Sequence, residues 1–164
     1  MNQNKNVLEY VLAYILWAVS IFLSFWVVMK ARDALLSALV VSSLDRFESN
    51  AREKFYTSLE IRVADVWSWL LVGLVLVVLI VYLEHVFRSL VSTARLWPAF
   101  WLISACQVGI FSLASLAIFL MESVVQPLTW RGFYFPLVEG IAAGFLFLLW
   151  GKTRRGKGHS MSGA

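Results

Sequence analysis

Residues 66–83 read VWSWLLVGLVLVVLIVYL, eighteen consecutive positions without a charged side chain. A helix of about 20 residues crosses the hydrocarbon layer of a bilayer, so this stretch is typical of a transmembrane span. Three more stretches share this character, and the sequence predicts spans at residues 7–29, 66–87, 96–121 and 133–150. Because lipid cannot hydrogen-bond to backbone groups, such spans are expected to be helical. The predicted fold class is an all-α membrane protein, a four-transmembrane-helix bundle.

The overall composition also favours a membrane environment. Of the 164 residues, 60% are hydrophobic and 15% are charged, and the mean hydropathy is +0.77. A typical soluble domain is about 25% charged. Tryptophan prefers the membrane–water interface, and most tryptophans lie near the predicted span ends: Trp26, Trp67, Trp69, Trp97, Trp130 and Trp150. We therefore expect one transmembrane domain over residues 1–151, surrounded by the lipid bilayer.

Residues 30–65 form the only long segment between predicted spans. Apolar residues recur there at helical spacing, and Asn50 with Glu53 resembles a capping box that begins a second helix. This pattern predicts an extramembrane helical hairpin. Its uncovered apolar face is expected to dock onto a partner subunit through Leu36, Val40, Leu44, Phe47, Phe55 and Leu59. The alternatives are a hairpin that lies in the interface or packs on itself, and a hairpin that senses a ligand.

Basic residues follow the fourth span, in a segment expected to be a disordered tail over residues 152–164. Lys152, Arg154, Arg155 and Lys157 are typical of a topology signal or of a contact with anionic lipid headgroups. Their placement directly after a span argues against a nucleic-acid partner. Local basic flanks favour cytoplasmic termini for three of the four spans. We therefore expect a multi-pass protein of the cell membrane (plasma or inner), with both termini cytoplasmic.

Glu139 is the most informative single residue because it lies within the fourth predicted span. A charged group near the centre of a bilayer costs about 2.5 kcal/mol or more, so such residues are usually paired or functional. Gln107, in the third span, is a possible hydrogen-bond partner. The alternatives are a proton or ion relay through these two residues and a contact with a polar group of another subunit.

Small residues form several candidate packing faces. Gly140 and Gly144 make a GxxxG motif in the fourth span, and small residues allow helix backbones to approach closely in lipid. A comparable face on the third span consists of Ala105, Gly109 and Ser112, and Ser20 with Ser24 makes one on the first. These faces predict helix–helix packing, within the chain or between chains.

The sequence shows no constellation that would carry catalysis or bind a cofactor. No HExxH, GxSxG or phosphate-binding loop is present. Glu84 and His85 are adjacent, so on a helix they diverge by about 100° and do not converge on a metal. Cys106 is the only cysteine and cannot form an intrachain disulfide. We therefore expect no cofactor, no metal site and no enzyme activity.

Three functions fit this pattern. The first is a non-catalytic accessory or scaffold subunit of a larger membrane complex, most plausibly a transport complex, with other membrane protein subunits as partners. The second is a small oligomeric transporter or channel that uses Glu139 and Gln107. The third is a membrane sensor with an extracytoplasmic helical hairpin. The absence of recognisable reactive groups favours the first.

Overall fold

The computed structural model describes residues 3–44, 51–91, 96–125 and 130–155, and those residues are almost entirely helical. Four long helices follow one another: α1 (Gln3–Ser42), α3 (Ala51–Val91), α4 (Leu96–Val125) and α5 (Trp130–Arg155). Each is long and apolar enough to cross a membrane. The prediction of an all-helical chain with four such helices is therefore confirmed.

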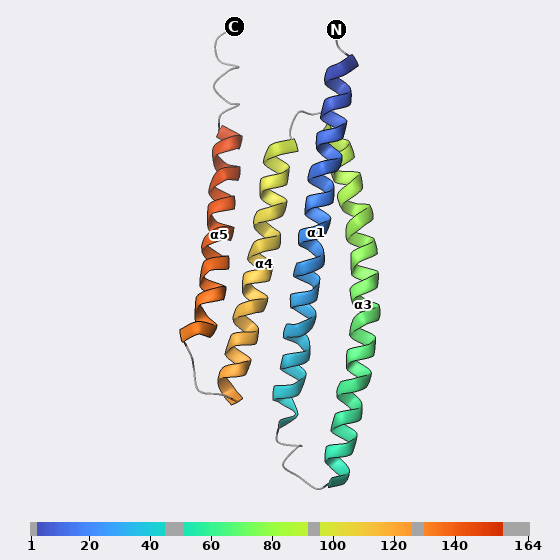
Figure 1. Cartoon of the computed structure of the whole chain (residues 1–164), viewed down its shortest axis with the longest axis vertical. Coiled ribbons are helices and arrows are strands. Elements are labelled where there is room, and N and C mark those ends of the chain that lie inside the picture. The colour runs from blue at the N-terminus through green and yellow to red at the C-terminus, as the bar shows by residue number, and fades with distance from the viewer. Residues whose placement is uncertain (1–2, 45–50, 92–95, 126–129, 156–164) are drawn as a thin grey trace.

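The helices lie side by side in one row rather than around a common centre. Along the row the order is α3, α1, α4 and α5, so α1 and α4 are the inner helices (Figure 1). Among the described residues α5 contacts only α4, and α3 touches α4 only slightly. In the most apolar 18-residue stretch of α5, only 6% of the residues are buried. The row therefore leaves two broad apolar faces uncovered.

The main hydrophobic core lies near the helix ends at which α1 begins and α5 ends (Figure 1). There α1, α3 and α4 meet. Phe87 of α3 is its most buried large side chain, with 2% of its surface exposed. It belongs to a cluster of buried apolar residues from all three helices: Ala13, Leu16, Leu83, Val91, Leu96 and Phe100. This core fixes α3 and α4 against the first half of α1.

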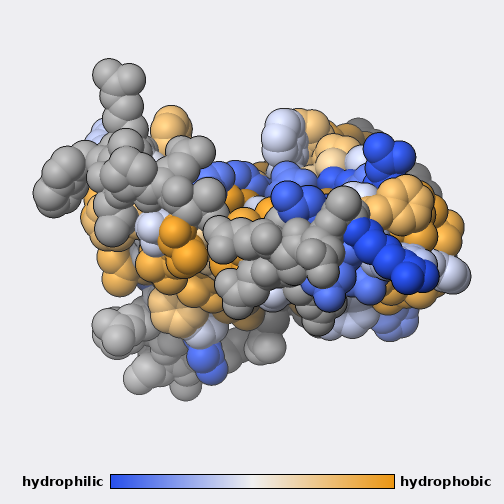
Figure 2. Space-filling view, turned by 90° about the horizontal axis from the view of Figure 1, so that it is seen from below, coloured by the Kyte–Doolittle hydropathy of each residue, from blue (hydrophilic) through white to orange (hydrophobic). Residues whose placement is uncertain are grey.

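At the opposite end α3 begins beyond the level at which α4 ends and α5 begins, whereas α1 ends beside the last turns of α4 (Figure 1). No proline or glycine precedes Gly73 in the chain, so α1 continues as a helix well past the predicted end of the first span at residue 29. Seen from this end, hydrophilic surface is concentrated on the α1–α3 side of the molecule (Figure 2). We name residues 33–44 of α1 and 51–64 of α3 the α1–α3 extension; its α1 part lies beside the end of α4.

Two helix boundaries differ from the sequence-based ones for identifiable reasons. At its C-terminus α5 continues to Arg155, because no proline interrupts it and basic side chains are favourable in the last helical turn, so residues 152–155 of the expected tail are helical. At its N-terminus α5 begins at Trp130, ahead of the predicted start at residue 133, and so contains Pro136. Proline has no backbone N–H and disturbs the preceding turn, and the first turn of α5 departs from the helix line in Figure 1.

Candidate functional site

Gln107 joins α4 to α1 near the middle of both helices. Its side-chain amide donates to the backbone oxygen of Ser20 at 2.9 Å and to Ser24 Oγ at 2.6 Å. Ser24 Oγ in turn donates to the Ser20 oxygen at 2.8 Å. Both serines are almost fully buried, so these small residues form a close contact between the two helices. The structure thus places Gln107 against α1, whereas Glu139 lies on α5.

Replacing Gln107 with leucine keeps the side-chain size and removes both interhelical hydrogen bonds. Hydrogen bonds between membrane helices contribute on average about 0.6 kcal/mol and at most about 1.7 kcal/mol. We expect the free energy of unfolding to fall by about 1 kcal/mol, measured by SDS unfolding in mixed micelles. Ser123→Ala is the control, because that exposed hydroxyl bonds only within its own helix. Equal stability of Gln107→Leu and the wild type would contradict this role.

Glu139 lies on α5 and is partly buried. Its Oε2 atom is buried and has no hydrogen-bond partner among the described residues. Oε1 of Gln107 is likewise buried and unpartnered within that part of the chain. No hydrogen bond joins these two side chains in the described structure, so the anticipated contact between them stays a prediction.

Gly140 and Ser112 make a close contact between α4 and α5. A Cβ atom added to Gly140 would lie 3.3 Å from Ser112 Oγ. Ser112 Oγ also donates to the backbone oxygen of Pro136 at 3.0 Å, so its position is fixed from the α5 side. A Cβ atom added to Gly144 or to Gly109 would meet nothing within 4 Å. Of the two glycines in the GxxxG motif, only Gly140 makes such a close contact with the described residues. The remaining member of the predicted α4 face, Ala105, is buried.

Arg32 is the centre of a polar cluster that the sequence analysis did not identify. Its side chain is only 11% exposed, and Nε donates to Ser68 Oγ of α3 at 2.9 Å. One terminal nitrogen forms an ion pair with Asp65 of α3, and the other pairs with Asp33 at 3.2 Å. The guanidinium also lies 4.3 Å from the ring centroid of Trp69. Arg32 therefore ties α1 to α3 through charge, hydrogen bonds and a cation–π contact.

An open groove lies between the last turns of α1 and the last turns of α4. Its volume is about 430 Å³, and its apolar wall comes from Leu36, Val40, Val41 and Met121. Two of these residues belong to the predicted docking face. Of the other docking residues, Leu44 is partly buried, Phe55 and Leu59 are exposed, and Phe47 lies outside the described residues. Apolar side chains of the α1–α3 extension thus face outward instead of covering one another.

The basic residues after the fourth span are only partly described. Lys152 and Arg154 are exposed on the last turn of α5. The Arg154 guanidinium lies 5.6 Å from the ring centroid of Trp150. The Arg155 side chain and Lys157 lie outside the described part of the chain, as does most of the expected tail.

No group of three or more His, Cys, Asp or Glu that could hold a metal occurs among the residues the structure describes. Comparisons with protein-family models, with curated proteins and with solved structures found no match for this chain.

Proposed function

We propose that this chain is a non-catalytic integral membrane subunit that packs against a larger membrane protein complex. The observation that carries the proposal is the open row of four helices. A row has no interior in which to enclose a solute, and its outer helices leave long apolar faces uncovered. Four spans with several small-residue contacts and little polar chemistry are well suited to a scaffold or accessory role.

The α1–α3 extension supports docking in particular. Soluble surfaces rarely carry many neighbouring large apolar side chains, yet Val40, Phe55, Leu59 and Val63 are 39%, 65%, 48% and 49% exposed. The Arg32 cluster holds α1 and α3 together at the base of this extension. The proposal places the extension outside the bilayer on the extracytoplasmic side of the cell membrane, with both termini cytoplasmic. A transport complex is the expected class of partner.

A transporter or channel is less well supported than the subunit role. That function would use Gln107 and Glu139 together on one pathway. The amide nitrogen of Gln107 is instead occupied by Ser20 and Ser24 on α1, and Glu139 belongs to the outer helix α5. The unpartnered Glu139 Oε2 atom agrees equally well with a polar contact to a neighbouring subunit.

The subunit proposal predicts a defined co-purifying partner that depends on the groove beside α4. The tagged chain is extracted from its own membranes in mild detergent, sized under native conditions, and its bound proteins are identified. We expect Leu36→Ser combined with Val40→Ser to reduce recovery of the partner by about ten-fold or more, equivalent to about 1.4 kcal/mol. A control, Lys54→Ser with Arg62→Ser, changes two exposed charged residues of α3 that do not line the groove. A lone monomer, or equal loss of the partner in both double variants, would overturn the proposal.

A further inference from the structure

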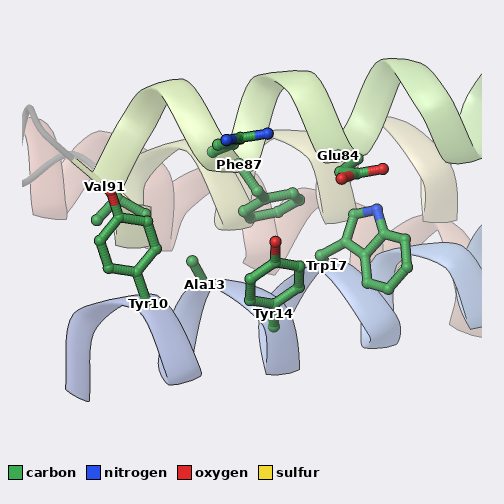
Figure 3. Close-up of a pocket in the computed structure, with 8 residues that line it drawn as sticks. Tyr10, Ala13, Tyr14, Trp17, Glu84, Phe87 and Val91 are labelled. Carbon is green, nitrogen blue, oxygen red and sulfur yellow. The ribbon is translucent and has the colours of Figure 1, made fainter. Parts of the chain in front are cut away.

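A second groove lies between the first half of α1 and the last turns of α3, near the hydrophobic core. Its walls combine aromatic side chains with two opposite charges: Tyr10, Tyr14, Trp17, Phe87, Glu84 and Arg88. Figure 3 shows Tyr10 and Tyr14 rising from α1 toward α3, and the Glu84 carboxylate above the Trp17 ring. Ala13 and Phe87 form a closely packed floor and are only 3% and 2% exposed.

The two charges of this groove are free to bind a ligand. Within the described residues, neither Glu84 nor Arg88 forms a hydrogen bond or an ion pair. They are four positions apart on α3, which places their Cβ atoms about 5–6 Å apart on one helix face. The groove therefore presents one negative and one positive group, about one helical turn apart, beside aromatic rings.

The aromatic wall is held in place. The Trp17 indole N–H donates to the backbone oxygen of Ile80 at 3.4 Å, which fixes the ring against α3. The Tyr14 and Trp17 ring centroids are 6.0 Å apart, with the rings nearly perpendicular. Rings of this kind attract organic ammonium groups through cation–π interactions, and a nearby carboxylate strengthens that attraction. An arginine guanidinium binds phosphate.

We propose that this groove binds a phosphorylated amino alcohol, such as phosphocholine or phosphoethanolamine. The ammonium group lies against Glu84 and the rings of Tyr14 and Trp17, and the phosphate lies against Arg88. A simple cation is disfavoured because Arg88 repels it, and a simple phosphate is disfavoured because Glu84 repels it. The groove has a volume of about 10 Å³, room for one water, so the ligand lies across its mouth. The same group occurs free in solution and as a phospholipid headgroup.

Calorimetric titration tests the free form of the ligand. Phosphocholine is titrated into the purified full chain in a neutral maltoside detergent. We expect saturable binding that weakens by about ten-fold or more in Glu84→Gln and in Arg88→Gln, because each variant removes one charged contact. Glu9→Gln and Arg62→Gln are matched controls, since both residues are exposed and neither lines the groove. Choline or inorganic phosphate alone should bind at least ten-fold more weakly than phosphocholine.

Lipid nanodiscs test the headgroup form. The chain is placed in phosphatidylglycerol nanodiscs containing a minority of phosphatidylethanolamine, and retained lipid is identified by native mass spectrometry. Selective retention of phosphatidylethanolamine that is lost in Glu84→Gln and Arg88→Gln would assign the site to a lipid. Titratable binding of phosphocholine with the same dependence would assign it to a soluble ligand. The proposal is overturned if neither ligand binds, if both variants bind as the wild type does, or if choline or phosphate alone binds equally well.

Discussion

Replacing Arg32 with alanine is expected to lower the free energy of unfolding by about 2–3 kcal/mol. The guanidinium is nearly buried, and its removal leaves Asp65 without its ion-pair partner and Ser68 and Trp69 without their contacts. Breaking a fully buried pair costs about 3–5 kcal/mol. The Asp65 side chain is 47% exposed, so water compensates part of that loss and a smaller effect follows. SDS unfolding in mixed micelles measures the difference.

Arg62→Ala is the matched control for Arg32. Arg62 is an exposed arginine of the same α1–α3 extension, and an exposed substitution is expected to change stability by no more than about 0.5 kcal/mol. A double-mutant cycle with Asp65→Asn should show that the Arg32 and Asp65 effects are not additive. If Arg32→Ala were as stable as Arg62→Ala, the cluster would not be what holds α1 to α3.

The second large effect is expected from Gly140→Leu. The new Cβ atom would lie 3.3 Å from Ser112 Oγ, closer than an ordinary van der Waals contact, so the α4–α5 contact has to shift to admit it. Ser112 cannot turn away without losing its 3.0 Å hydrogen bond to the Pro136 oxygen. Overpacking of this kind typically costs about 1–3 kcal/mol. We expect a loss in that range, measured in the same unfolding experiment.

Gly144→Leu provides the control within the same GxxxG motif. Nothing lies within 4 Å of a Cβ atom at that position, so the isolated chain should accept the leucine with a change of no more than about 0.5 kcal/mol. Equal destabilisation by both substitutions would show that α4 and α5 do not pack as described. A partner lost only in Gly144→Leu would instead mark that glycine as a contact between chains.

The four helices were predictable because length and apolar composition are sufficient to indicate a span. Their lateral order was not. Helices that are apolar on every side give no period from which to tell a packed face from an exposed one. Val72 is buried on α3, for example, while Val75, Val77 and Val78 on the same helix are exposed. Small differences in side-chain shape at the contacts decide which helices become neighbours.

The interhelical polar contacts were only partly predictable. Gln107 and Ser112 are five residues apart, so they point about 140° away from each other on α4. The structure turns Gln107 toward α1 and Ser112 toward α5. The sequence does not indicate which of these two residues faces the helix that carries Glu139. The Arg32–Asp65 pair did leave a signal. Arg32 follows the first predicted span and Asp65 precedes the second, and the facing ends of consecutive antiparallel spans lie at the same level.

Cys106 offers the most direct test of the central claim that these helices lie in a membrane. It is the only cysteine of the chain, and it is exposed on the surface of α4. A charged, water-soluble maleimide should therefore leave it unmodified in both sealed and permeabilised membranes, because lipid covers it, and should modify it after denaturation in SDS. Lys54→Cys, on the exposed α1–α3 extension, should be modified in permeabilised membranes, and the proposed extracytoplasmic side predicts its modification in intact cells as well. Rapid modification of Cys106 in native membranes would contradict the account.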